Sequence, residues 1–329
     1  MDTIRWGVLG VANIGERAVI PAIQRSRNGR LVAIASRDAP RAQDAARRLG
    51  IPRAHGSYEA LVVDPEVQAV YIPLPNSLHH RWTIRAAEAG KHVLCEKPLA
   101  PSAAECAEMI DACRQHGVTL MEAFMYRFHP RTERVAQLAA DGSLGEIRLV
   151  RAAFTFQIRN PDRNIRLRPE LGGGALYDVG CYTVNVSRMI LGEPERVYAQ
   201  GHVGAYGVDE QLGAVLDFGG GRMALIDCGV MLPGRQEYEV VGTKGRLGVP
   251  TAFLPGTADA EIHVWKGTDS NVVTIPGMDE YQGMVERFGD ALLAGAPPPL
   301  PPVDAVRNLR VIEALLGSLR SGRPEAVAA

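Results

Sequence analysis

The chain has 329 residues, of which 46% are hydrophobic and 22% are charged, and its formal net charge is -1. This length is sufficient for two domains, each with a core of its own. Because acidic and basic residues are balanced and interspersed, the charge gives no reason to expect nucleic acid or a membrane as a partner.

The five cysteines form an odd set without a C-x-x-C pair, which excludes a disulfide framework and a cysteine zinc site. The eight histidines show no metal-ligand spacing, so we expect no bound metal. The first strand begins near Ile4, which leaves no room for a signal peptide, and no apolar run is long enough to span a bilayer. We therefore expect a cytoplasmic protein with reduced cysteines.

Strands and helices alternate through residues 1–125. The apolar runs that predict strands are Ile4–Leu9, Leu31–Ala35, Ala69–Ile72, His92–Cys95 and Val118–Glu122. Helices are predicted between them, one from an Asp38 cap to Leu49 and another after a Ser102 cap. This alternation predicts an α/β dinucleotide-binding (Rossmann) domain with a doubly wound parallel sheet.

The turn after the first predicted strand reads Gly10-Val11-Ala12-Asn13-Ile14-Gly15, a dinucleotide fingerprint with one departure. Gly10 allows a tight turn and Gly15 allows close packing of the helix on the strand, but Ala12 adds a methyl group where backbone should approach a pyrophosphate. We expect the nucleotide to contact Gly10, Ala12, Asn13 and Ile14. The alternative is a tight turn that binds no nucleotide.

The second predicted strand ends in Ser36-Arg37-Asp38, where a site selective for NAD places an acid against the ribose. Arg41 lies one helical turn further on, so its guanidinium can converge with that of Arg37. Two cations and the Ser36 hydroxyl suit a 2′-phosphate, which predicts NADP(H) as the cofactor. Against this, Asp38 can turn inward, and both arginines can be solvated surface charge.

A turn rich in proline follows the strand that ends at Ile72. Its functional interpretation places Pro73, Asn76 and His79 at the nicotinamide end of the cofactor. Its structural interpretation is that Asn76 or Ser77 caps the next helix and that the prolines only extend the backbone.

Glu96-Lys97-Pro98 directly follows the short strand that ends at Cys95. Open α/β sheets bind ligands at the carboxyl ends of their strands, so we expect Glu96 and Lys97 beside the cofactor. Lys97 is a candidate catalytic residue, and the alternative is a surface lysine at the end of a strand.

From Glu146 the pattern changes to strands separated by turn signals, which predicts an α+β domain over 126–329. The predicted strands are Ile147–Gln157, Arg196–Val203, Gln211–Phe218, Arg222–Met231, Glu237–Gly242, Ile262–Lys266 and Val272–Pro276. They predict a large, mostly antiparallel, open-faced sheet whose apolar side a second copy can cover, as a homodimer or homotetramer. Two helices follow, about Glu280–Leu293 and Val303–Leu319, and the last can pack back on the first domain.

One predicted helix interrupts these strands and follows Gly172-Gly173-Gly174. The glycines allow backbone to approach a ligand closely. Asp178 and Tyr182 are four residues apart, so they share a helix face and can form a proton-transfer unit. The alternative is a helix that packs Tyr182 into the core and places Asp178 near its positive end.

Together, these motifs resemble the Gfo/Idh/MocA oxidoreductases along essentially the whole chain. Tyr182 in place of the commoner histidine, with residues 122–130 (EAFMYRFHP), is most similar to the branch of glucose–fructose oxidoreductase, NADP-dependent xylose dehydrogenase and dimeric dihydrodiol dehydrogenase. The resemblance implies that Lys97 and Tyr182 are the catalytic pair and that Asp178 supports the substrate. It also implies a cis peptide before Pro98.

The function expected from these motifs is hydride transfer between NADP(H) and a carbinol or carbonyl carbon of a sugar or polyol. A free phenol has a pKa of about 10, so Tyr182 needs a nearby cation such as Lys97 to ionise near neutral pH. Arg127 and Arg166 can line the substrate cleft or form ordinary salt bridges. The alternatives are a trans-dihydrodiol dehydrogenase and a nucleotide-binding regulator without turnover.

Overall fold

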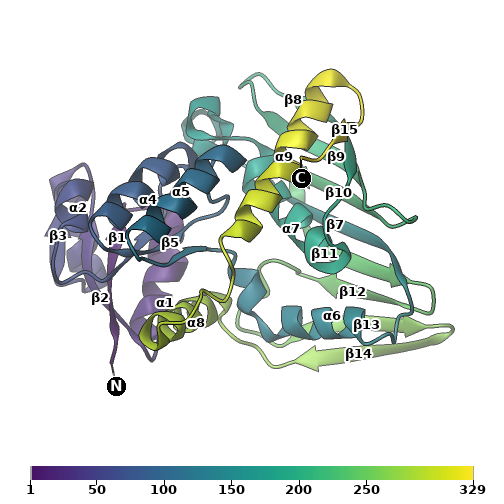
Figure 1. Ribbon diagram of the computed structural model, residues 1–329, viewed down its shortest axis with the longest axis horizontal. Coiled ribbons are helices and arrows are strands. Elements are labelled where there is room, and N and C mark those ends of the chain that lie inside the picture. Colours follow the sequence, from purple (N-terminus) through teal and green to yellow (C-terminus); the bar gives the residue numbers. More distant parts are fainter. Residues whose placement is uncertain (1, 329) are drawn as a thin grey trace. The chain divides into compact units, whose positions relative to one another are not determined.

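The computed structural model describes residues 2–328, which form two compact units (Figure 1). The first unit contains residues up to Met125 together with Asp279–Val306, and the second contains Tyr126–Met278 and residues from Arg307 onward. No helix within residues 2–328 is both long and apolar enough to cross a membrane.

A parallel six-stranded sheet forms the centre of the first unit as the structure describes it. Its strands are β1 (Ile4–Leu9), β2 (Gly29–Ala35), β3 (Arg53–His55), β4 (Ala69–Ile72), β5 (His92–Cys95) and β6 (Leu120–Glu122). The order β3-β2-β1-β4-β5-β6 reverses direction between β1 and β4, which is where doubly wound sheets bind nucleotides. The predicted class of the first domain is confirmed.

The helices of this unit are α1 (Ile20–Arg25), α2 (Ala39–Leu49), α3 (Tyr58–Val62), α4 (His79–Glu88), α5 (Ala103–Gln115) and α8 (Glu280–Ala294). Neighbouring residues of β1 show that both faces of the sheet are covered. The Trp6 ring packs on Phe288 of α8 with ring centroids 5.8 Å apart, whereas a Cβ on Gly7 would meet Leu61 of α3 at 2.8 Å. Because adjacent strand residues point to opposite faces, α8 and α3 lie on opposite sides of the sheet.

Local capping signals in this unit were predicted with mixed success. The Asp38 side chain accepts a hydrogen bond from Arg41 N at the start of α2, and Ser102 does the same for Glu105 N at the start of α5. The expected cap at Asn76 or Ser77 is wrong, because the N-cap positions of the 3-10 turn Asn76–Leu78 and of α4 fall on Pro75 and Leu78.

A nine-stranded sheet forms most of the second unit in the described part of the chain. Its strands are β7 (Ile147–Gln157), β8 (Arg196–Val203), β9 (Asp209–Asp217), β10 (Met223–Gly229), β11 (Met231–Gly242), β12 (Arg246–Pro250), β13 (Ala260–Lys266), β14 (Asp269–Ile275) and β15 (Glu325–Ala326). They lie in the order β14-β13-β12-β11-β7-β10-β9-β8-β15. Only β7 and β10 pair in parallel, so the predicted mostly antiparallel sheet is confirmed for the described residues.

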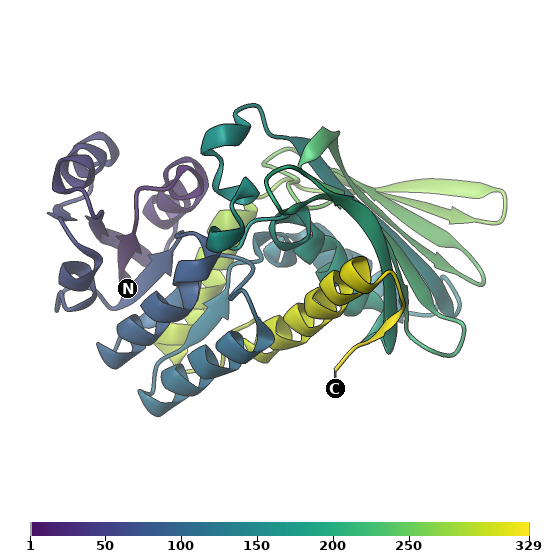
Figure 2. The ribbon, with the colours of Figure 1, turned by 90° about the horizontal axis from the view of Figure 1, so that it is seen from above.

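The helices α6 (Pro130–Ala140) and α7 (Cys181–Leu191) lie on one side of this sheet (Figure 2), and α9 (Val303–Ser321) follows α8 in the chain. Alternate residues of β7 point to the two faces of this sheet. Val150, Ala152 and Phe154 are buried on the side of the helices, whereas Arg151 is exposed on the other side. The open face that the alternation predicted is therefore present.

Candidate functional site

The loop after β1 has the geometry of a phosphate-binding turn. Gly10 has φ +118°, and a Cβ there would meet Leu74 at 2.9 Å, so both conformation and space require glycine. Ala12 and Ile14 are half-buried and Asn13 is exposed. No side-chain cap satisfies the start of the following helix, which leaves its first N–H groups suited to a pyrophosphate.

The role expected of Gly15 in close packing is not borne out by its surroundings. The nearest atoms to a Cβ at this position would be Pro73 Cγ and Tyr71 Cε1, both at 3.7 Å, which is ordinary contact. The second glycine of the motif is thus not required by packing against the strands, unlike Gly10.

Arg41 lies across the loop where the adenosine ribose of a dinucleotide would bind. Its Nη2 donates to Val11 O at 2.6 Å. Asp38, which could have competed as an acid facing the ribose, instead caps α2, and its backbone N–H donates to Ser36 Oγ at 3.2 Å. Ser36 is buried and Arg37 is exposed beside it. The Asp38 carboxylate therefore does not turn inward to face the ribose, which was the argument against a 2′-phosphate site here.

The ends of β4 and β5 hold Glu96 and Lys97. The Tyr71 hydroxyl donates to Glu96 Oε1 at 2.7 Å, and burial together with this carboxylate holds the pKa of Tyr71 well above its usual range. The peptide between Lys97 and Pro98 is cis. Lys97 itself is half-buried at the carboxyl end of β5, the position that the sequence predicted.

His79 holds two loops together, and its expected contact with the ribose is corrected by its environment. The side chain is fully buried, with Nε2 2.8 Å from Leu74 O and Nδ1 3.0 Å from Pro98 O. Burial lowers the pKa of His79. The imidazole therefore ties the loop after β4 to the segment that carries Lys97, and it presents no surface to a cofactor.

The helix that continues from the π turn Leu176–Gly180 into α7 carries the second group of candidate residues. Arg166 Nε donates to Asp178 Oδ2 at 2.6 Å, and the guanidinium lies 5.7 Å from the Phe156 ring centroid. The Asp178 side chain is only 14% exposed, against 42% for Arg166. The structure thus brings together two of the three expected substrate residues of the second unit, and it makes Arg166 the residue that orients the acid.

Tyr182 lies one turn further on the same helix and is held by aromatic rings. Its ring centroid is 5.3 Å from that of Phe154, 5.4 Å from Phe253 and 5.8 Å from Tyr126. The ring is 5% exposed and lies in mostly apolar surroundings. In such surroundings a nearby cation stabilises the phenolate form more strongly than it would in water. Lys97 belongs to the first unit and Tyr182 to the second, so their pairing stays a prediction.

Asn185 was missed by sequence reasoning. It lies a further turn along α7, and its Oδ1 accepts from the Tyr126 hydroxyl at 2.5 Å and from Arg127 Nη1 at 3.1 Å. Arg127 is therefore held beside the helix face that carries Asp178 and Tyr182. Asn185 lies three residues after Tyr182 on the same face, and continuing the helical spacing by one step would have identified it.

The glycines before this helix approach the protein's own chain. A Cβ on Gly173 would meet Arg166 O at 2.6 Å and Arg168 O at 2.8 Å. Gly174 has φ +122°, and a Cβ there would lie 2.2 Å from Asp209 Oδ1. The expectation that these glycines serve a ligand is thus corrected: they let the loop and a buried carboxylate close on the start of the helix.

Residues 4–124 match the family described as an oxidoreductase family with an NAD-binding Rossmann fold, and residues 132–248 match the GFO/IDH/MocA C-terminal domain. The chain belongs to the Gfo/Idh/MocA oxidoreductase family. The predicted resemblance, fold class and enzyme class are confirmed.

Curated Gfo/Idh/MocA relatives align over most of the chain. It is 46% identical to D-xylose 1-dehydrogenase (NADP(+)) 2 of Haloferax volcanii over 321 residues, 96% of this chain and 98% of the relative. It is 36% identical to trans-1,2-dihydrobenzene-1,2-diol dehydrogenase of Xenopus tropicalis over 261 residues, 77% of each.

Solved structures of Gfo/Idh/MocA proteins have the same fold as this chain. A 3-ketoreductase from Actinomadura kijaniata, in complex with NADP and TDP-benzene, superposes with a TM-score of 0.91 at 33% identity over 96% of this chain and 98% of that one. An aldose-aldose oxidoreductase from Caulobacter crescentus, complexed with glycerol, has a TM-score of 0.91 at 29% identity over 98% and 99% of the two chains.

Proposed function

We propose that this protein is an NADP(H)-dependent oxidoreductase that transfers hydride between the nicotinamide and a carbinol or carbonyl carbon of a sugar or polyol. The observation that carries the proposal is the stripe of Asp178, Tyr182 and Asn185 on one helix, with Arg166 bound to the acid. A carboxylate and a phenol so placed can bind one substrate hydroxyl and exchange a proton with another. The names of the xylose dehydrogenase and the 3-ketoreductase support this substrate class.

The proposed roles follow from the chemistry of the side chains. During oxidation, Tyr182 Oη takes the proton of the reacting hydroxyl, and it returns that proton during reduction. The Lys97 ammonium favours the phenolate form. Asp178, oriented by Arg166, accepts a hydrogen bond from a neighbouring hydroxyl and so fixes the substrate. The bound nicotinamide supplies the acceptor or donor of the hydride.

The test is a panel of aldoses, ketoses and diols, assayed with NADP+ or NADPH at the absorbance band of the reduced nicotinamide. Turnover of a sugar or polyol is expected. Binding of NADPH without turnover of any member of the panel would instead favour a regulator.

A second candidate, trans-dihydrodiol dehydrogenase activity, is favoured by the 36% identity to the Xenopus tropicalis enzyme over 77% of each chain. A trans-dihydrodiol in the same panel separates the two candidates through its kcat/KM relative to that of the best sugar.

We also propose that NADP(H) is preferred through Arg41. The Arg41→Ala variant should raise KM for NADP+ by about 10- to 100-fold, because a charge-assisted bond to the 2′-phosphate contributes about 1.5–3 kcal/mol. KM for NAD+ should hardly change. Arg47→Ala is the matched control, since Arg47 is exposed on the same helix and its ion pair among residues 2–328 is with Asp44. Equal losses for both cofactors, or none for either, would contradict the assignment.

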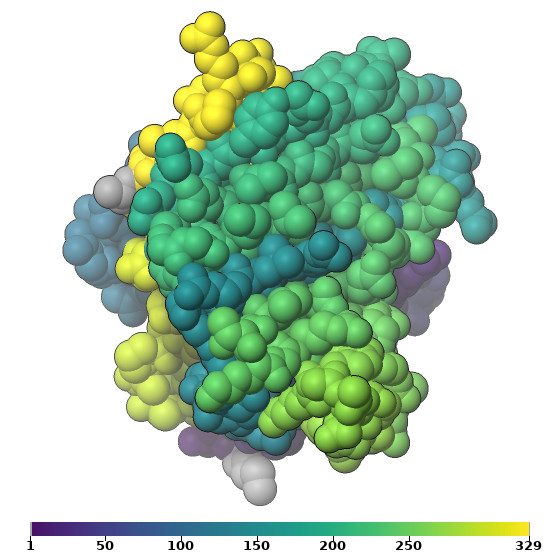
Figure 3. Space-filling model, turned by 90° about the vertical axis from the view of Figure 1, so that its right-hand side faces the viewer, coloured from purple at the N-terminus to yellow at the C-terminus, as the bar shows by residue number. Residues whose placement is uncertain are grey.

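We propose that the open sheet face of the second unit binds a second copy of the chain, giving a homodimer or homotetramer. One row of outward residues crosses the strands: Tyr198, Val215, Leu225, Arg151, Glu239, Gly248, His263 and Val272. Figure 3 shows strand residues covering this face. Val215 and Met223 on the adjacent strands β9 and β10, and Val272 on the edge strand β14, leave 39–47% of their surface in contact with water, so apolar area is exposed at both ends of this face.

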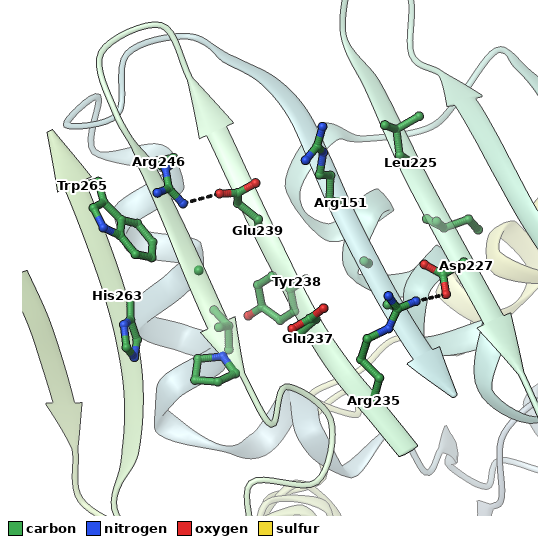
Figure 4. Close-up of a pocket in the computed structure, with 16 residues that line it drawn as sticks. Arg151, Leu225, Asp227, Arg235, Glu237, Tyr238, Glu239, Arg246, His263 and Trp265 are labelled. Carbon is green, nitrogen blue, oxygen red and sulfur yellow. Dashed lines mark hydrogen bonds and ion pairs between the residues drawn. The ribbon is translucent and has the colours of Figure 1, made fainter. Parts of the chain in front are cut away.

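A hollow of about 560 Å³ opens in this face (Figure 4). Arg246 bonds Glu239 and stacks on Trp265 with its guanidinium carbon 3.7 Å from the ring centroid, and Arg235 pairs with Asp227. Because two arginines of this face are paired with acids of the same face and Leu225 lies between charged residues, the same surface on a second copy can pack on it with little like-charge repulsion.

The Val215→Glu variant should weaken this association about 10- to 100-fold, because a symmetric interface would bury two uncompensated charges. Sedimentation equilibrium should show a shift towards the 35.5 kDa monomer. Val63→Glu, at a site in the first unit that is 69% exposed, is the control and should leave the mass unchanged. A monomeric wild type at micromolar concentration would refute the interface.

We finally propose that the protein works in the cytoplasm. The supporting observation is that all five cysteines are buried free thiols. Burial raises the pKa of Cys113 to about 12, which keeps that thiol unreactive. Fractionation of the host cells, followed by detection of the protein, tests this location.

A further inference from the structure

Asp209, the first residue of β9, is a buried acid outside the stripe that carries the proposed chemistry. It is 5% exposed. Its Oδ2 accepts a hydrogen bond from Leu176 N at 2.7 Å, across 33 positions of sequence. The amides of Ala175 and of Asp209 itself also stabilise the charged carboxylate. The acid therefore binds the amino end of the helix that bears Asp178 and Tyr182.

The residues at the start of this helix leave room for the Asp209 carboxylate and provide no side-chain cap of their own. The residue before the first turn, Ala175, offers no side-chain cap, so the cap comes from a distant strand instead. At Gly174 even a methyl group would collide with Asp209 Oδ1, as its 2.2 Å separation from a built Cβ shows. One turn later, a Cβ on Gly180 would lie 2.9 Å from Cys228 Sγ, so the helix also sits directly on β10.

The titratable groups around Asp209 leave its charge without a cation in the described part of the chain. The Cys228 thiol of β10 faces it, and burial and the nearby charge of Asp209 raise the pKa of that thiol. On the neighbouring segments, Arg166 and Asp178 pair with each other, Tyr206 bonds Asp162, and the Glu210 side chain lies against Gly204. The backbone N–H groups of the helix start are thus the partners of the carboxylate.

We propose that Asp209 is a positioning residue for the reaction: its ionised carboxylate fixes the amino end of the helix and thereby the placement of Asp178 and Tyr182. This inference rests on the proposed function. Both carboxylate oxygens can accept N–H groups, whereas a protonated acid turns one oxygen into a donor and loosens the helix start. Since burial raises the pKa of Asp209 to about 6, this loosening falls within an accessible pH range.

The test compares Asp209→Asn with the wild type, and with Asp217→Asn as the control, at the far end of the same strand where the side chain is 39% exposed. We expect Asp209→Asn to lower kcat by about 10- to 100-fold, because small displacements of catalytic groups have effects of this size. The Kd for NADPH should be unchanged. The wild type should show a step in kcat near pH 6, and this step should be lost in Asp209→Asn and retained in Asp217→Asn. A variant with normal kcat and an unchanged pH profile would overturn the proposal.

The contribution of Asp209 to the stability of the fold should fall as pH rises, whereas its contribution to kcat should rise. This difference distinguishes a positioning role from a purely structural one. An acid whose pKa is raised by folding contributes stability that is fully present below about pH 4, its unfolded pKa, and is lost as pH rises through about 6. The Tm of the wild type minus that of Asp209→Asn should therefore rise as pH is lowered. If the Tm difference fell as pH was lowered, the conclusion that Asp209 is a buried acid without a cationic partner would be wrong.

Hydrogen exchange distinguishes failure of this inference from failure of the proposed function. The amides of Ala175 and Leu176 should exchange faster in Asp209→Asn than in the wild type at pH 8, after correction for intrinsic rates. If no substrate is turned over but this difference is present, the proposed function fails and the positioning role stands. If substrates are turned over and the exchange is unchanged, the positioning role fails alone.

Discussion

Replacing Tyr182 by Phe is expected to reduce kcat by about 10²- to 10⁴-fold, the usual effect of removing a general acid or base. Phenylalanine keeps the ring contacts with Phe154, Phe253 and Tyr126, so the helix and its surroundings should be unchanged. Steady-state kinetics with the best substrate gives kcat, and fluorescence titration gives the Kd for NADPH, which should match the wild type.

The matched control is Tyr198→Phe on the outward face of β8, which should retain full activity. Near-normal turnover by Tyr182→Phe would remove the tyrosine from the mechanism. A loss of NADPH binding in the same variant would instead mean that the phenol supports the cofactor.

Gly174→Ala is expected to lower the free energy of unfolding by about 2–5 kcal/mol, the sum of an unfavourable backbone conformation and of overpacking. The added methyl group must occupy the space of Asp209 Oδ1 at a residue with φ +122°. Since this displaces the cap from the helix that carries Asp178 and Tyr182, kcat should fall as well. Urea denaturation followed by circular dichroism measures the stability.

Gly234→Ala is the control, because a Cβ at Gly234 would meet nothing within 4 Å and its φ is ordinary. It should change the free energy of unfolding by less than about 0.5 kcal/mol, as surface substitutions usually do. If both variants were equally stable, the close approach of the carboxylate to Gly174 would not be a constraint on the fold.

The parts of the fold that the sequence predicted are those with local signals. The cap at Asp38, the strands that end at Ile72 and Cys95, and the length of β7 all follow from residues within a few positions of one another. The strand β12 was missed because its five residues, RLGVP, include a glycine and a proline and show little alternation. Its place in the sheet comes from pairing with β11 and β13.

The candidate site divides in the same way. Lys97, Asp178 and Tyr182 could be proposed from the sequence because each stands at a recognisable strand end or helix face. His79 was misassigned because its partners, Leu74 O and Pro98 O, are backbone atoms that no motif records. Asp209 could not be found, since its contact with Leu176 spans two elements and depends on how β9 meets the helix start.

The first unit is made from two separated stretches of sequence, and this has a consequence for synthesis on the ribosome. Its parallel strands are complete at Glu122, but α8, which supplies Phe288 against Trp6, emerges only after β14 has been translated. A nascent chain therefore exposes this apolar patch until α8 has been translated, a period in which chaperones bind such surfaces. A premature stop codon between β6 and α8 would accordingly damage the nucleotide-binding unit, although every strand of its sheet would already have been translated.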